Sequence, residues 1–241
     1  RWCTTHSTVN CELAAATQTP LKFAGLTTRG PRPQIHIEDI YVHRSFESAD
    51  GSHLPGETLL AALDLDPTDA PRHLVTGAAG AGKTTFCRHL VGALARRDRV
   101  VLLLRLRALA GDPQDCGALL DVAARWIRIQ FALTVTAADV ARLLECEACV
   151  VLFDGLDEIA SEDTRRELIE RLHAFALRFP GVPLVVTSRE QVLRQTPLDP
   201  IFVPLRLIPF STDDAALLIT RLFATADLGP PAAAHAFFEQ L

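Results

Sequence analysis

The sequence predicts an α/β fold in which a mostly parallel sheet of five strands is flanked by helices. Two observations support this prediction. Short apolar segments alternate with longer segments whose apolar residues recur at helical spacing, and this alternation is typical of parallel sheets. The apolar segments are also almost continuously hydrophobic, as parallel strands are when helices cover both of their faces.

The strands are expected after a weakly patterned N-terminal segment that ends in the linker-like stretch "GLTTRGPRPQ". Alternation in "IHIEDIYV" (residues 35–42) predicts a short strand before the main sheet. The five strands of that sheet are predicted at residues 73–76, 99–107, 149–154, 182–189 and 201–210.

Helices are expected between these strands and after the last one. Thr136 and Ser161 precede two of them and are expected as N-caps, and the acidic residues after Ser161 complement the helix dipole. The helices are predicted at residues 83–95, 117–133, 136–145, 161–179 and 211–224, with another beginning at residue 230.

Composition and charge argue against several classes of protein. The chain has 241 residues, of which 49% are hydrophobic and 22% are charged, as in globular domains with a substantial core. The net charge of −5 argues against a global nucleic-acid-binding surface but leaves room for local basic patches. The longest apolar run is interrupted by Arg105 and Arg107, well short of the ~18 residues that span a bilayer, so we expect no membrane partner. Because the chain begins with arginine and contains no methionine, we expect it to be part of a longer protein.

The six cysteines are scattered along a chain that is large for a disulfide-stapled domain. Cys87 falls on a predicted helix and suits a small buried position. Cys146 and Cys149 have the spacing of metal ligands, but the sequence offers no second pair to complete a zinc site. We therefore expect reduced cysteines and a cytoplasmic location.

The stretch "GAAGAGKTT" carries the strongest functional signal. It fits the pattern G-x-x-x-x-G-K-[ST] and joins a predicted strand to a predicted helix. Glycines allow the backbone to wrap closely and direct its N–H groups at phosphate, and the helix N-terminus adds partial positive charge. The alternative, a glycine- and alanine-rich turn without function, does not account for the lysine, the threonine and the strand–helix context. The predicted nucleotide-binding residues are Gly77, Ala78, Gly80, Ala81, Gly82, Lys83, Thr84 and Thr85.

An acidic partner for this loop is expected in "VVLFDGLDE". Asp154 ends a predicted strand at the sheet edge where open α/β folds bind ligands, so it would hold Mg²⁺ opposite Thr84. Asp157 and Glu158 follow closely, and one of them would orient or deprotonate the attacking water. We favour Glu158 as the base, with Asp157 supporting the magnesium ion and the water. Capping of the next helix is the alternative role for both acids.

The segment "FDGLDE" downstream of "GAAGAGKTT" resembles the NACHT domains of the STAND class of P-loop NTPases, as in NLR-like proteins of bacterial type. The two acids after Asp-Gly are the distinctive feature, and the resemblance covers residues 36–241, including "RLRAL", "LVVTSRE" and "LIPFSTDDAALLITRLF". It implies the sheet order 5-1-4-3-2. It also divides the chain into an N-terminal segment (1–35), a nucleotide-binding domain (36–207) and the start of a helical subdomain (208–241).

The resemblance also implies further site residues. Thr187 and Arg189 would lie near the γ-phosphate, and Tyr41 and Val42 would lie on the adenine side. At a strand end, Arg189 is also suited on physical grounds to stabilise developing charge, although a surface arginine is the alternative.

By the same resemblance, the protein would bind ATP or ADP with Mg²⁺, hydrolyse ATP slowly, and act as a signalling switch in bacterial immunity or regulation. Its nucleotide state would control self-assembly into a homo-oligomer, with sensor and effector domains outside the present chain. The principal alternative is an AAA-type remodelling ATPase with steady turnover. A small-molecule kinase and a nucleic-acid-binding regulator are less favoured alternatives.

Overall fold

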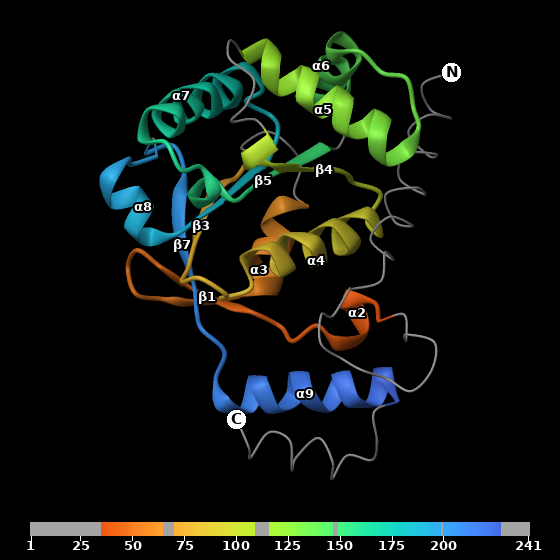
Figure 1. The fold of residues 1–241 in the computed structure, drawn as a ribbon, viewed down its shortest axis with the longest axis vertical. Helices are drawn as coiled ribbons and strands as arrows, with labels where there is room; N and C mark the ends of the chain where they lie inside the picture. Colours follow the sequence, from red (N-terminus) through yellow and green to blue (C-terminus); the bar gives the residue numbers. More distant parts are fainter. Residues whose placement is uncertain (1–34, 65–69, 109–115, 147–148, 199, 228–241) are drawn as a thin grey trace.

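The computed structural model describes residues 35–64, 70–108, 116–146, 149–198 and 200–227. Seven strands form one sheet in the order β2-β1-β7-β3-β6-β5-β4, with helices on both of its faces (Figure 1). The strands are β1 (Ser45–Ser48), β2 (His53–Pro55), β3 (Arg72–Thr76), β4 (Val100–Arg105), β5 (Cys149–Asp154), β6 (Leu184–Ser188) and β7 (Val203–Leu207).

The five main strands of this sheet are parallel, as predicted. Numbered along the chain from β3, they lie in the order 5-1-4-3-2, so the predicted order is confirmed. All residues of β5 and β6 are buried, because helices cover both faces at the centre of the sheet. The carboxyl ends of the parallel strands therefore meet at a single edge.

Helices α3 (Gly56–Leu63) and α4 (Lys83–Ala95) lie on one side of the sheet, and α5 (Cys116–Phe131), α6 (Ala137–Cys146) and α7 (Glu162–Arg178) lie on the other (Figure 1). The expected caps are present. The Ser161 hydroxyl accepts a hydrogen bond from the Thr164 N–H, and Thr136 and Asp139 bond reciprocally. None of the helices in the described ranges is both long and apolar enough to cross a membrane.

The strand predicted at residues 35–42 is wrong. Residues Ile37–Ile40 form a short helix, α2, and the strand β1 begins only at Ser45. Ile37 and Ile40 are both buried, while Glu38 and Asp39 between them are exposed. A spacing of three residues places both isoleucines on the same side of a helical turn, and this signal overrode the apparent strand alternation.

Several short elements were not predicted. Strands β1 and β2 form an antiparallel hairpin that extends the sheet beyond β7. Its turn is polar, with Gly51 at φ 83° and the Asp50 carboxylate accepting from the Ser52 N–H. Helix α3 and helix α8 (Glu190–Gln195) were also missed. These elements are too short or too polar to produce a clear hydrophobic period.

Other expectations lie outside the described residues: the weakly patterned segment 1–34 and the helix expected from residue 230. Cys87 and Cys149 are buried free thiols, as expected for Cys87. Cys149 begins β5, whereas the side chain of Cys146 is outside the described part.

Helix α9 (Thr212–Ala226) lies apart from the sheet and packs against α2 (Figure 1). A small apolar cluster joins the two helices through Ile40 and Ala226, with Leu218 and Leu222 packed against it. Ser211 and Asp214 form a capping box at the start of α9, and such boxes fix the point at which a helix begins. The chain thus leaves the sheet after β7 and re-engages the N-terminal part of the described chain.

Candidate functional site

The candidate site lies at the carboxyl edge of the parallel strands. Strand β3 leads into the glycine-rich loop, β5 ends at Asp154, and β6 ends at Ser188. Two short 3-10 helices, η2 (Leu106–Ala108) and η3 (Leu156–Glu158), follow β4 and β5. The topology therefore brings the sequence-predicted loop and the sequence-predicted acids to one place.

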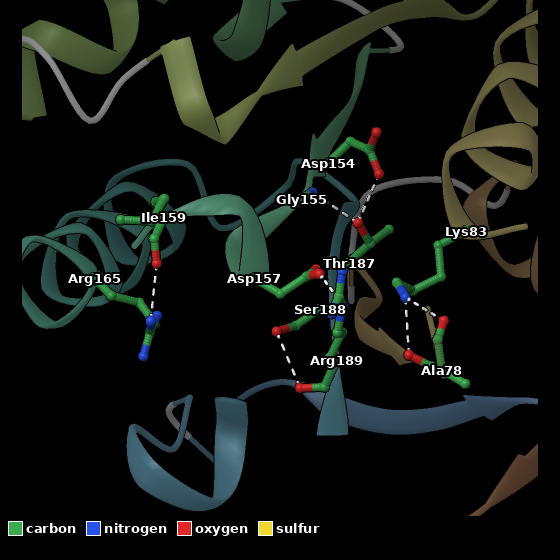
Figure 2. Close-up of polar contacts among 11 residues, drawn as sticks. Ala78, Lys83, Asp154, Gly155, Asp157, Ile159, Arg165, Thr187, Ser188 and Arg189 are labelled. Atoms are coloured by element: carbon green, nitrogen blue, oxygen red, sulfur yellow. Dashed lines mark hydrogen bonds and ion pairs between the residues drawn. The ribbon is translucent and has the colours of Figure 1, made fainter. Parts of the chain in front are cut away.

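The loop wraps around the ammonium group of Lys83. Its Nζ donates to the carbonyls of Gly77 and Ala78 at 2.8 and 2.9 Å (Figure 2). Gly82, at φ 93°, is the N-cap of α4, a left-handed conformation that favours glycine. Burial lowers the pKa of Lys83, an effect that Asp157 and Asp154 oppose and Arg189 reinforces. A phosphate chain in this loop would give the ammonium charged oxygens in place of neutral carbonyls.

Asp154 is held from two sides. Its Oδ2 accepts a hydrogen bond from the Thr84 hydroxyl at 2.8 Å, and its Oδ1 accepts one from the Thr187 hydroxyl at 2.7 Å. The Thr187 oxygen in turn accepts from the Gly155 N–H at 2.9 Å (Figure 2). Thr187 is fully buried and Asp154 is 5% exposed. The carboxylate is thus fixed in orientation, with one oxygen directed at the start of α4.

These groups fit a magnesium ion. Mg²⁺ prefers hard oxygen ligands and is commonly held by a carboxylate with a hydroxyl or water. The Thr84 hydroxyl and the Asp154 carboxylate are such a pair, and their hydrogen bond brings the two oxygens together at the end of the phosphate loop.

The turn after Asp154 is tight. Gly155 has φ 87°, and a Cβ atom at this position would lie 3.1 Å from the carboxyl carbon of Glu158. The positive φ favours glycine here. From α7, the buried Arg165 donates to the Ile159 carbonyl at 2.8 Å and so fixes the far end of the turn (Figure 2).

Each acid of this turn is paired with an arginine. Asp157 Oδ2 lies 2.7 Å from Arg189 Nε, and the Asp157 side chain is 7% exposed. Glu158 Oε2 lies 3.6 Å from Arg107 Nε, and the Glu158 side chain is 44% exposed. The little-exposed side chain of Asp157 is therefore engaged with Arg189, whereas Glu158 can reach solvent. The assignment of Glu158 as the base stays a prediction.

Tyr41 and Val42 lie in the connection between α2 and β1 and are both buried. The Tyr41 ring stacks on His89 of α4, with centroids 3.6 Å apart and planes 6° from parallel. A cavity of about 240 Å³ adjoins this pair and is also lined by Arg44 and Phe86. The assignment of Tyr41 and Val42 to the adenine side of the site stays a prediction. Thr85, in the first turn of α4, is exposed.

Three arginines around the site were not foreseen from the sequence. Arg107 pairs with Glu158, Arg165 holds the turn after β5, and Arg44 donates to the carbonyl of Ala81 in the phosphate loop. Arginine is frequent throughout the chain, so no sequence signal distinguishes these three from surface residues. Burial is the distinguishing property for Arg44 and Arg165, and burial depends on the tertiary structure.

Comparisons with known proteins agree with this fold. The family model for the NACHT domain matches residues 72–226. A crystal structure of a DNA replication initiation factor is similar with a TM-score of 0.52 and 13% identity, over 77% of this chain and 55% of that one. The replication initiator DnaA bound to AMPPCP and single-stranded DNA gives a TM-score of 0.51, also at 13% identity and with the same coverage of both chains.

At this level of identity the two solved structures support the fold alone. The chain spans about half the length of each of them. No curated protein sequence matches it.

Proposed function

Because the chain belongs to the NACHT domain family of P-loop NTPases, we propose that it binds ATP with Mg²⁺ and acts as a nucleotide-operated signalling switch. One observation carries this proposal: the Thr84 hydroxyl is hydrogen-bonded to Asp154 at the end of a loop that wraps around Lys83. These are the three side chains that such a fold needs for phosphate and magnesium. Residues 36–207 would form the nucleotide-binding domain, and residues 208–241 would begin a helical subdomain.

Binding would rely on the loop from Gly77 to Thr85. Backbone N–H groups of the loop and the N-terminus of α4 would contact the phosphates, and Lys83 would exchange its carbonyl acceptors for phosphate oxygens. Tyr41 and Val42 would contact the base. The chain contains no guanine-reading N/T-K-x-D stretch, so adenine is the proposed base.

Hydrolysis would depend on the acids and arginines at the strand ends. When bound at Thr84 and Asp154, Mg²⁺ would neutralise charge on the β- and γ-phosphates. Glu158 would accept a proton from water, and Arg189 would stabilise charge on the γ-phosphate. Arg189 is paired with Asp157, so it would have to leave or share this ion pair during the reaction. Such a requirement supports a slow, weak ATPase.

The switch would depend on a difference in nucleotide affinity between two conformational states of the protein. A nucleotide shifts a conformational equilibrium only to the extent that it binds the two states differently. ATP would favour an open state that assembles into a homo-oligomer, and ADP would favour a closed monomer. The full-length protein would act in the cytoplasm, with sensor and effector domains outside this chain, in bacterial immunity or regulation.

Single-turnover hydrolysis and native mass measurements test this proposal against a motor-type ATPase. A switch should turn over slowly, and a non-hydrolysable ATP analogue should change its oligomeric mass relative to ADP. Glu158→Gln should keep the ATP-bound mass distribution for longer than the wild type. Steady, rapid turnover with the same mass in both nucleotides would instead support the remodelling ATPase.

A further inference from the structure

Arg44 is a buried cation between the phosphate loop and the connection that leads into α9. It is 6% exposed and immediately precedes β1, two residues after Val42. Buried arginines are uncommon unless their guanidinium groups are paired or hydrogen-bonded. The acceptors of Arg44 come from two distant parts of the chain.

The first acceptor is in the phosphate loop. Arg44 Nη2 donates to the Ala81 carbonyl at 3.2 Å. A trans peptide is planar, so its C=O and N–H point in opposite directions. With the Ala81 carbonyl held by Arg44, the N–H of Gly82 must point away from Arg44. Arg44 therefore sets the direction of one of the N–H groups with which the loop would contact phosphate.

The second acceptor is in the connection between β7 and α9. Arg44 Nη2 also donates to the Ile208 carbonyl, and the Ile208 N–H donates to the Ser45 carbonyl at 3.0 Å. The guanidinium lies over the ring of Phe210, 3.9 Å from its centroid. The connection is thus attached to Arg44 and Ser45 just before α9 begins.

The attachment extends to α9 itself. Burial lowers the pKa of Arg44, and the charges of Tyr41 and Asp214 oppose this effect. Asp214 is in the first turn of α9. Further along α9, Arg221 donates to the Tyr41 carbonyl. The segment containing Tyr41 and Arg44 is consequently bonded to the middle of α9 and feels the charge at its beginning.

We propose that Arg44 is a positioning residue that couples the phosphate loop to α9, so that phosphate bound in the loop changes how firmly α9 is held. A shift of the Ala81 peptide on phosphate binding would change one of the two hydrogen bonds that Nη2 makes and, with it, the hold on Ile208 and Phe210. This inference rests on the proposed nucleotide binding. It adds a physical connection through which the bound nucleotide would affect α9.

Hydrogen exchange of the full 241-residue chain, with and without a non-hydrolysable ATP analogue and Mg²⁺, tests the coupling. In the wild type, the analogue should change exchange rates in residues 208–226. Arg44→Lys keeps the charge but loses the planar guanidinium that lies over Phe210 and directs both N–H groups of Nη2 at the two carbonyls. It should reduce this nucleotide-dependent change at least about fivefold, the lower end of typical coupling between sites. Arg206→Lys is the matched control, since Arg206 pairs with Glu47 on the neighbouring strand and should leave the response unchanged.

The outcomes separate this inference from the function on which it rests. If the wild type binds the analogue and Arg44→Lys responds as fully as the wild type does, Arg44 is not the connection. Arg44 is also excluded as the connection if Arg44→Lys raises exchange equally with and without the analogue, because that is a purely structural effect. If the wild type binds no nucleotide, the proposed function and this inference both fail.

A second variant, Phe210→Leu, changes the residue that Arg44 contacts before α9 and leaves Arg44 itself unchanged. Phe210 is 41% exposed, so Phe210→Leu should fold. Coupling is reciprocal, and weakening the contact of Arg44 with Phe210 should change the affinity for the ATP analogue about fivefold. Unchanged affinity in Phe210→Leu would overturn the proposal.

Discussion

Thr187→Val removes one buried hydroxyl and keeps the volume of the side chain nearly constant. That hydroxyl donates to Asp154 at 2.7 Å and accepts from the Gly155 N–H at 2.9 Å, and Thr187 has no exposed surface. The substitution leaves a buried carboxylate with one partner fewer and a backbone N–H without its acceptor. Stability should therefore fall much further than for an ordinary threonine.

The magnitude follows from these two bonds. A hydrogen bond to a charged group contributes about 1.5–3 kcal/mol, and an unsatisfied buried N–H costs about 1–3 kcal/mol. Because the effects of neighbouring bonds are not simply additive, we expect Thr187→Val to lower the free energy of unfolding by about 3–4 kcal/mol. This is a large part of the roughly 5–15 kcal/mol that stabilises a typical domain.

Urea unfolding of the wild type and three variants measures this effect. Thr187→Ser keeps the hydroxyl and should lose about 1 kcal/mol, the contribution of one buried methyl group. Thr220→Val is the matched control, since its exposed hydroxyl bonds only to the Ala216 carbonyl of its own helix, and it should change stability by less than about 0.5 kcal/mol. If Thr187→Val were as stable as Thr220→Val, the hydroxyl would not be the support of Asp154 described above.

The remaining predictions concern Lys83 of the phosphate loop, the acid Glu158 and the half-buried His89. Lys83→Arg keeps the charge but places a broad guanidinium in a loop that closes on a narrow ammonium, so fluorescent ATP titration should show at least about tenfold weaker binding; equal affinity would contradict the close wrapping. Glu158→Gln should bind Mg-ATP normally but slow single-turnover hydrolysis by at least about a hundredfold; an unchanged rate would transfer the role of base to another residue. Burial lowers the pKa of His89 to about 4 from an ordinary 6.5, and His43 and Arg96 add to this effect. The unfolded chain therefore binds more protons between these values, and stability should fall on the order of 2 kcal/mol as the pH drops from about 6.5 to about 4. His89→Gln should remove that part of the pH dependence in urea unfolding, and an identical pH profile would show that His89 is not its source.

The main sheet was predictable because continuous apolar runs and helical periods alternate regularly from residue 72 onward. The periodicity gave the five parallel strands, and α4 begins and ends at Lys83 and Ala95 as expected. The segment 35–55 was not predictable in the same way. Ile35 and Ile37 alternate as in a strand, whereas Ile37 and Ile40 have the spacing of a helical turn. The β1–β2 hairpin is mostly polar.

The candidate site could be predicted only where local sequence determines the geometry. The loop and Asp154 are defined by motifs at strand ends, and the structure brings Thr84 and Asp154 into contact. The support of Asp154 by Thr187 depends on the pairing of β5 with β6, which no local pattern specifies. The role of Arg44 is harder still to predict, because the carbonyls that accept its hydrogen bonds lie 37 and 164 residues away in the chain.

Calorimetric titration of Mg-ATP into the wild type, Lys83→Ala and Lys22→Ala tests the central claim most directly. Lys22 and Lys83 are the two lysines of the chain, so the pair of variants removes the same charge within and outside the phosphate loop. The proposal predicts one bound nucleotide in the wild type and in Lys22→Ala, and no measurable binding in Lys83→Ala. Equal affinity in all three proteins, or no binding in the wild type, would contradict it.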